Sequence, residues 1–201
     1  MAVDLVVCVA TEMEGALLRG RVPVLVTGIG AVNAGVALTR YLEREGARSV
    51  ISCGIAGAYP GAFEEIGLGG VVCAESECYG DLGAHSGSGF LDLRAMGFPL
   101  IGEDVFNELP MGLFPAERRA KFVTVNSCSG DDAGARALAE RSGGSVESME
   151  GAAIAHVAML YGIPVGEIRG ISNRAGNRDR GAWRVREAAE AAQRGLLGWV
   201  G

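Results

Sequence analysis

Hydrophobic positions along this chain follow two alternating patterns, which predict strands and helices in turn. Short continuous apolar runs such as Val3–Ala10 are typical of strands that are buried on both faces. Between such runs, apolar residues recur three and four positions apart, which is the spacing of one helix face. The alternation begins at the first residues and predicts an α/β fold with a largely parallel or mixed sheet.

The predicted elements follow one another without an internal repeat. Strands are expected at Val3–Ala10, Val22–Thr27, Ser49–Cys53, Gly70–Cys78, Lys121–Asn126, Ser145–Glu147 and Val165–Ser172. One helix is expected from the stripe Ala34, Ala37, Leu38, Tyr41 and Leu42, ending at Gly46. Others are expected at about Asp132–Ser142, at about Glu150–Tyr161, and at the C-terminus with Val185, Ala188, Ala189, Ala192 and Leu196 on one face.

Two glycine-rich stretches interrupt this pattern. The sequence GIAGAYPG follows the third strand and is expected to form a turn. The segment from Tyr79 to Arg119 carries many glycines and prolines and little periodicity, so we expect loops with short helical pieces there. An irregular segment of that length in a compact domain is usually functional. The 201 residues are expected to form a single domain, residues 1–201.

Composition narrows the class of protein. The net charge of −6 and the absence of a Lys/Arg run disfavour nucleic acid as a partner. No apolar run approaches the roughly 20 residues that span a bilayer, and no leader pattern opens the chain, so a soluble, cytoplasmic protein is expected. The 5 cysteines form no CxxC pair and there are only 2 histidines, so we expect neither a metal nor another cofactor.

Candidate chemistry lies where predicted strands end. Glu12 and Glu14 follow the first strand, Glu150 follows the Ser145 strand, and Asn173 follows the last. Ligands of open α/β sheets bind at the carboxyl ends of strands, so these side chains are expected to converge on one cleft. Taken alone, Glu150 also fits the alternative role of a carboxylate at a helix N-terminus.

The loop VTGIGAVNAG offers a second kind of site. It places Gly28 and Gly30 at a strand-to-helix turn, but Asn33 stands where a dinucleotide fingerprint has its third glycine. A dinucleotide site is therefore not expected. The amides around Gly30 are still able to hold a water molecule or an anionic group at the helix N-terminus.

Five segments together resemble the nucleoside phosphorylase and nucleosidase superfamily: VATEMEG, VTGIGAVNAG, ISCGIAGAY, VESMEGAAIAHVA and EIRGISN. Within it the likeness is to the hydrolases, namely methylthioadenosine/S-adenosylhomocysteine nucleosidases and, more closely, futalosine hydrolases. The resemblance implies a nucleoside phosphorylase-like fold of three layers, with a central mixed β-sheet flanked by helices. It also implies a homodimer or a higher homo-oligomer.

The same resemblance implies roles for individual residues. Glu14 would be the general base that holds the attacking water, and Glu150 would accept hydrogen bonds from the ribose hydroxyls. Met149 would pack against the sugar, and Asn173 would face the imidazole side of the purine as the second catalytic residue. The further residues expected to contact the nucleoside are Gly30, Ser148 and Ser172.

Two departures from related enzymes indicate the substrate. Adenine-specific nucleosidases have an aspartate where this chain has Asn173, and an amide offers both a donor and an acceptor, which suits a 6-oxopurine. Superfamily phosphorylases carry a glycine and arginine loop where this chain reads TEMEG, and carboxylates disfavour phosphate. We therefore expect hydrolysis of futalosine to hypoxanthine and dehypoxanthine futalosine, in menaquinone biosynthesis. A methylthioadenosine/S-adenosylhomocysteine nucleosidase and a non-catalytic nucleoside-binding protein remain alternatives.

The remaining polar candidates are expected to have other roles. His156 shares a helix face with apolar residues and is expected in the core or an interface. Arg169 lies inside the final strand and is expected to pair with a buried acid. Futalosine carries an aryl carboxylate at its 5′ end, and the candidates for its cationic partner are Arg94, Arg174, Arg178 and Arg180.

Overall fold

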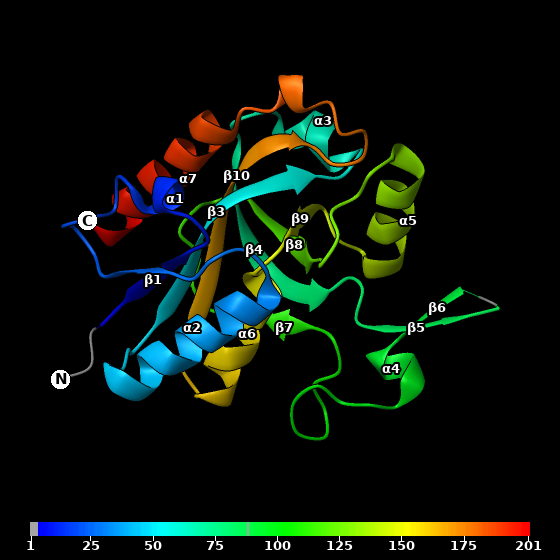
Figure 1. Ribbon diagram of the computed structural model, residues 1–201, viewed down its shortest axis with the longest axis horizontal. Helices are drawn as coiled ribbons and strands as arrows, with labels where there is room; N and C mark the ends of the chain where they lie inside the picture. Colours follow the sequence, from blue (N-terminus) through cyan, green and yellow to red (C-terminus); the bar gives the residue numbers. More distant parts are fainter. Residues whose placement is uncertain (1–3, 88) are drawn as a thin grey trace.

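An eight-stranded mixed sheet forms the centre of the computed structural model, which describes residues 4–87 and 89–201 (Figure 1). Its strands are β1 (Val6–Val9), β2 (Val24–Val26), β3 (Val50–Ala58), β4 (Val71–Tyr79), β7 (Leu109–Pro110), β8 (Arg119–Thr124), β9 (Val146–Ser148) and β10 (Val165–Arg174). The main order is β10-β4-β8-β9-β3-β1-β2, with β7 on β4. Because β10 also pairs with β3, five of these strands close into a ring. Val3, the expected start of the first strand, lies outside the described residues.

Helices cover both faces of the sheet, which confirms the expected layered α/β fold. On one face lie α2 (Ala31–Arg44) and α6 (Gly151–Leu160), and on the other lies α7 (Val185–Val200) (Figure 1). The buried strand β1 shows why its sequence is continuously apolar. Val6 and Cys8 belong to the core on the α2 and α6 side, whereas Val7 and Val9 belong to the core beneath α7. Alternate side chains thus enter opposite layers.

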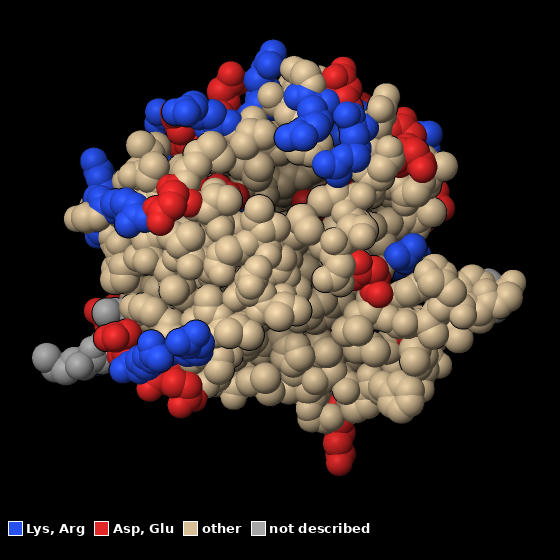
Figure 2. All heavy atoms as spheres, in the orientation of Figure 1, with Lys and Arg blue, Asp and Glu red and all other residues tan. Residues whose placement is uncertain are grey.

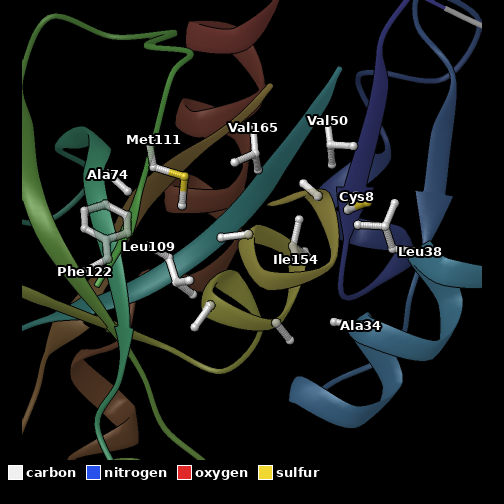
Figure 3. Packing of buried hydrophobic residues seen from close by; sticks show 14 of the residues in the cluster. Cys8, Ala34, Leu38, Val50, Ala74, Leu109, Met111, Phe122, Ile154 and Val165 are labelled. Carbon is white, nitrogen blue, oxygen red and sulfur yellow. The ribbon is translucent and has the colours of Figure 1, made fainter. Parts of the chain in front are cut away.

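The core between the sheet and α2 contains α6 as a middle element. Figure 3 shows Ile154 of α6 between sheet residues and the side chains Ala34 and Leu38 of α2. The α6 sequence is apolar on all sides, as a helix covered on several sides requires. This packing fixes the N-terminal end of α6, where Glu150 is the N-cap residue, against the end of β9.

Helix boundaries agree with the sequence where the capping signals are local. α5 spans Asp132–Ser142 as expected, because Asp131 caps it by accepting from the amide of Gly134 at 2.7 Å and Gly143 ends it at a φ of 67°. The expected face of α7 is also confirmed, with Ala188, Ala189, Ala192 and Leu196 buried. The short helices α1 (Glu12–Gly15), α3 (Ala62–Ile66) and η1 (Arg180–Ala182) were not expected.

The prediction that GIAGAYPG forms a turn after the third strand is wrong for the first part of that sequence. β3 continues through Ala58, so Gly54–Ala58 is strand rather than turn. A Cβ atom on Gly54 would stand 2.4 Å from Oε1 of Glu14 and 2.5 Å from Nη1 of Arg169. The glycine is therefore required by side chains that cross the strand, a long-range cause that a local turn signal does not reveal.

The segment from Tyr79 to Arg119 contains more regular structure than expected. The predicted short helical piece is present as α4 (Leu93–Met96), but β5 (Gly83–Ser86) and β6 (Gly89–Asp92) form a hairpin that the glycine content concealed. Figure 1 shows this hairpin projecting away from the central sheet. Within the described part of the chain, no helix is both long enough and apolar enough to cross a membrane.

The contact between β10 and α7 gives a first prediction. A Cβ atom on Gly170 would stand 2.0 Å from the carbonyl oxygen of Ala188, which belongs to the helix backbone. Gly170→Ala should lower the free energy of unfolding by about 1–3 kcal/mol, because a packed helix has to move. Denaturant unfolding followed by circular dichroism measures this change.

Gly198→Ala is the matched control for this substitution. Gly198 lies in α7 and a Cβ atom there would meet nothing within 4 Å. This variant should be as stable as the wild type or more stable by up to about 1 kcal/mol, since alanine favours a helix. Equal stability of both variants would contradict the close approach of β10 and α7.

Candidate active site

A cavity of about 280 Å³ opens at the carboxyl ends of the strands, close to the lower limit of roughly 300–1,000 Å³ for small-molecule sites. Its walls come from the ends of β1, β3, β9 and β10 and from the loops that follow β8 and β10. Figure 2 shows a hollow near the top of the molecule, with basic side chains along part of its rim. The expected convergence of Glu14, Glu150 and Asn173 on one cleft is confirmed.

Glu14 is held in the cavity wall by three hydrogen bonds. Its Oε1 accepts from the amide of Ile55 at 3.0 Å, and its Oε2 accepts from the amide and the hydroxyl of Thr11 at 3.0 and 2.8 Å. The contacts to Thr11 form the capping box of α1, so the short helix and the site are built by the same residues. Glu12 is the exposed neighbour that pairs with Arg19, and it does not line the cavity.

Glu150 faces the cavity from the N-terminus of α6. Its Oε1 accepts from the amide of Gly30 at 2.9 Å, and its Oε2 lies 3.5 Å from Nη2 of Arg169. Glu150 is at the N-terminus of α6, as the alternative role also expected, but its side chain makes no capping bond to that helix and its oxygens are directed to Gly30 and Arg169. Burial raises the pKa of Glu150, Arg169 and the Gly30 amide oppose this, and the charge of Glu14 adds to the increase.

Gly30 lies behind the cavity wall rather than in it. Its amide donates to Glu150, so the helix N-terminus that was expected to hold water or an anion binds a carboxylate of the protein itself. Ile29, the residue before it, lines the cavity in its place. The loop between β2 and α2 thus orients Glu150 and adds an apolar side chain to the site.

Arg169 is fully buried beneath the two carboxylates, which confirms its expected pairing with a buried acid. Its Nε donates to Oε1 of Glu167 at 2.6 Å, and its Nη1 and Nη2 donate to the carbonyl of Ile55 and the hydroxyl of Ser52. Burial lowers the pKa of Arg169, but three carboxylates around it raise that pKa above its ordinary value. The guanidinium is therefore a fixed positive charge.

Asn173 and Glu147 lie in one row across the sheet. Both are paired in register with Gly57 of β3, Asn173 from β10 and Glu147 from β9, and both line the cavity. A bulge in β10 between Ile171 and Asn173 sets this alignment. The amide of Asn173 is oriented by its neighbours, since Oδ1 accepts from the Ser172 hydroxyl at 2.8 Å and Nδ2 donates to the Arg174 carbonyl at 3.1 Å.

Of the other expected contact residues, Ser148, Met149 and Ser172 line the cavity. Of the four candidate arginines, Arg178 lines it and lies over the ring of Trp183 at 5.4 Å. Arg174 is engaged by Asp132 and Glu64 instead, and Arg94 lies over Phe106. Arg180 belongs to η1 and does not line the cavity.

Sequence reasoning missed several residues of the cavity wall. The clearest is Glu147, whose carboxylate accepts from the amide and hydroxyl of Ser129 at 3.1 and 2.7 Å. Burial raises its pKa, and the bonds from Ser129 oppose that increase. Its place in a strand two residues before Met149 was the available signal. Cys128 and Trp183 come from loops and gave no signal of their own.

No residue of the segment 79–119 lines this cavity among those that the structure describes. The expectation that this irregular segment has a function is therefore not tested by the cavity wall. His156 is half-buried and lies near Tyr79, with 3.4 Å between Nδ1 and the phenol oxygen, in a separate apolar groove.

The arrangement is suited to a reaction that develops positive charge in the ligand. The carboxylates of Glu14 and Glu150 lie in the part of the wall above Arg169, and the neutral amide of Asn173, with a free hydrogen, lies in another part beside Glu147. Fixed carboxylates in a site of low dielectric constant stabilise a cationic transition state without reorganisation. Cleavage of a glycosidic bond, which passes through an oxocarbenium-like sugar, has this requirement.

Comparison with known proteins identifies the family to which the chain belongs. Residues 9–197 match the family model described as the phosphorylase superfamily. A futalosine hydrolase of Thermus thermophilus is 39% identical over 183 residues, which cover 86% of this chain and 78% of that protein. A 5′-methylthioadenosine/S-adenosylhomocysteine nucleosidase of Helicobacter pylori has a TM-score of 0.82 at 16% identity, covering 100% of this chain and 98% of the other. The native structure of futalosine hydrolase of Helicobacter pylori gives the same four values.

Proposed function

Because the chain belongs to the phosphorylase superfamily and is similar to a curated futalosine hydrolase over most of its length, we propose that it hydrolyses the N-glycosidic bond of futalosine. The chain is an N-glycosyl hydrolase, and the products are hypoxanthine and dehypoxanthine futalosine, an intermediate of menaquinone biosynthesis. The observation that carries the proposal is the single cavity that holds Glu14, Glu150 and Asn173.

Each of these residues has one role in the proposed reaction. Glu14 is the general base that holds the attacking water, and Glu150 accepts hydrogen bonds from the ribose hydroxyls. Met149, which lines the cavity, packs against the sugar, and Ser148 and Ser172 are further wall residues that contact the nucleoside. As the glycosidic bond breaks, positive charge grows on the ribose and the bonds to Glu150 strengthen.

Asn173 recognises the purine base by hydrogen bonding. Its Oδ1 is an acceptor for the Ser172 hydroxyl, and one hydrogen of its Nδ2 is free of the bond to the Arg174 carbonyl. That hydrogen suits the exocyclic oxygen of a 6-oxopurine, whereas an adenine amine would bring two donors together. The methylthioadenosine nucleosidase alternative shares the fold but lacks this match.

Water is the second substrate rather than phosphate. Three carboxylates line the cavity, those of Glu14, Glu147 and Glu150, and a phosphate dianion would be repelled by them. Of the two glutamates in the TEMEG segment, only Glu14 contributes to this repulsion. Glu12 pairs with Arg19 and does not line the cavity.

A product assay tests the function as a whole. The wild-type protein should release hypoxanthine from futalosine at a rate that phosphate does not change. Methylthioadenosine should react with a kcat/KM lower by roughly ten- to hundredfold, because a buried donor left without a partner costs about 1–3 kcal/mol. Chromatography of the free bases, with inosine as a 6-oxo comparison, measures both.

Three outcomes of this assay would overturn the proposal. Equal turnover of 6-amino and 6-oxo nucleosides would indicate a broad purine nucleosidase, and a requirement for phosphate would indicate a phosphorylase. Binding of futalosine without any cleavage would indicate a nucleoside-binding protein. In addition, Asn173→Asp should narrow or invert the preference for the 6-oxopurine, and an unchanged preference in that variant would remove Asn173 from base recognition.

Glu14→Gln separates catalysis from binding. We expect kcat to fall by at least ~10²-fold, because the amide cannot take a proton from water. The dissociation constant for the nucleoside should change little and the protein should still fold, although the unfolding midpoint should fall, because the amide oxygen still accepts from Ile55 while the NH₂ group replaces an acceptor for Thr11. Single-turnover kinetics and calorimetric titration measure these quantities. Turnover near the wild-type rate would exclude Glu14 as the base.

The homodimer belongs to the proposal as well. An apolar groove of about 470 Å³ lies between α2 and α6, next to Val32, Val36 and Leu160, which are 78%, 52% and 62% exposed. Figure 2 shows few charges over the middle of this face, with acidic and basic side chains gathered near the C-terminal end of α2. Exposed apolar patches of this kind mark interfaces. We assign this face to a second copy of the chain, as the family resemblance implies.

Analytical ultracentrifugation tests the dimer with a matched pair of variants. The wild type should sediment as a dimer, and Val36→Glu should sediment as a monomer because it buries a charge in the interface. Leu68→Glu is the control, since Leu68 is 45% exposed but lies outside the groove. A monomeric wild type, or dissociation by both variants alike, would contradict this interface.

A further inference from the structure

Two more carboxylates lie behind Glu150, outside the cavity wall. Glu77 of β4 and Glu167 of β10 are both fully buried. They meet beneath the first residue of α6: a Cβ atom on Gly151 would stand 2.1 Å from Oε1 of Glu77 and 2.1 Å from Oε2 of Glu167. Nothing in the proposed reaction uses either side chain directly.

The hydrogen bonds around this pair leave one oxygen unexplained. Oε1 of Glu167 accepts from Nε of Arg169 at 2.6 Å, but its Oε2 is buried without a partner among the described residues. Oε2 of Glu77 accepts from the amide of Cys78 at 3.1 Å and from the hydroxyl of Thr124 at 3.2 Å. Oε1 of Glu77 is thus the oxygen that faces Glu167, with the Ser148 hydroxyl 3.5 Å away.

Two ionised carboxylates in contact inside the core would be strongly unfavourable, and so would an acceptor with no donor. One proton shared between Glu77 and Glu167 removes both problems. Arg169 indicates which residue carries it, because its guanidinium is bonded to Glu167 and needs a carboxylate there.

We propose that Glu77 is held as a neutral carboxylic acid whose Oε1 donates a hydrogen bond to Oε2 of Glu167, and that this pair positions Arg169 and, through it, Glu150. Burial raises the pKa of Glu77 well above its usual range, and the neighbouring Glu167 charge raises it further, while Arg169 and Thr124 oppose the increase. Glu77 and Glu167 are positioning residues, since neither reaches the cavity.

The effect reaches the site through the guanidinium. With Nε fixed by Glu167, Nη2 lies between the Ser52 hydroxyl at 3.1 Å and Oε2 of Glu150 at 3.5 Å, and Nη1 donates to the carbonyl of Ile55 at 3.3 Å. The groups that face Glu150 are Arg169, the Gly30 amide, Glu14 and Glu167. The charge of Glu167 is one cause of the raised pKa of Glu150, so its removal should lower that pKa.

Glu77→Gln and Glu167→Gln form a matched pair of isosteric variants that should behave differently. In Glu77→Gln the amide NH₂ replaces the acid as donor to Glu167, and the amide oxygen still accepts from Thr124 and Cys78. In this variant kcat and KM should stay within about twofold of the wild-type values, and the pH profile should shift by no more than a few tenths of a pH unit. The unfolding midpoint should change little, since no charge is lost.

Glu167→Gln removes the charge that holds Arg169. We expect kcat to fall at least ~10-fold with a smaller change in KM, because Glu150 acts more strongly in the transition state. The acid limb of kcat/KM should move to lower pH, since Glu150 then titrates with a lower pKa. Equal damage from both variants, or damage from Glu77→Gln alone, would overturn the assignment of the proton.

The kinetic readout rests on the proposed function, so infrared spectroscopy supplies a second measurement that needs no substrate. Wild-type protein labelled with ¹³C-glutamate should show the carbonyl stretch of a protonated carboxylic acid at neutral pH, and Glu77→Gln should lose it. Absence of that band from the wild type would overturn the proposal even if a variant failed to fold. Its presence in a protein without futalosine turnover would leave the pair intact and reject the proposed function instead.

Discussion

The site depends on one buried guanidinium. Arg169 is surrounded by the charges of Glu14, Glu150 and Glu167, and its guanidinium also donates to the carbonyl of Ile55 in β3. Breaking a buried ion pair leaves an uncompensated charge at a cost of about 3–5 kcal/mol, whereas the intact pair adds little to stability compared with apolar residues. Such a cluster is therefore better explained by the geometry that it imposes on carboxylates than by any gain in stability.

The sheet topology brings these charges together. β10 pairs with both β3 and β4, so Arg169 and Asn173 lie near residues from three parts of the sequence. Side chains cross β3 where it has no side chain of its own, at Gly54, and the bulge around Ser172 lets the end of β10 align with Gly57. Small residues and one irregular strand thus create the space that the charged groups occupy.

The sequence predicted what local signals determine. Capping residues indicated where α5 begins and ends, and apolar periodicity identified α7 and the buried strands. Glu14, Glu150 and Asn173 could be found because strand ends converge in this kind of sheet. The position after the first strand did not by itself distinguish Glu14 from Glu12, and only the family resemblance selected Glu14; in the structure the bonds to Thr11 and Ile55 hold Glu14 inward. The strand character of Gly54–Ala58 and the Glu77–Glu167 contact arise from partners more than 30 residues away, and no local pattern encodes them.

Charge separation explains why the proposed roles are divided between acids and an amide. Breaking the glycosidic bond leaves positive charge on the ribose and sends electrons into the purine. In the proposed complex the carboxylates of Glu14 and Glu150 would lie beside the ribose and lower the energy of the first charge, whereas a carboxylate facing the purine would raise the energy of the second. In its proposed role, Asn173 would offer that purine a neutral donor. Glu147, which lies beside Asn173, accepts hydrogen bonds from the amide and hydroxyl of Ser129, and these bonds offset part of the negative charge that its carboxylate brings to this end of the cavity.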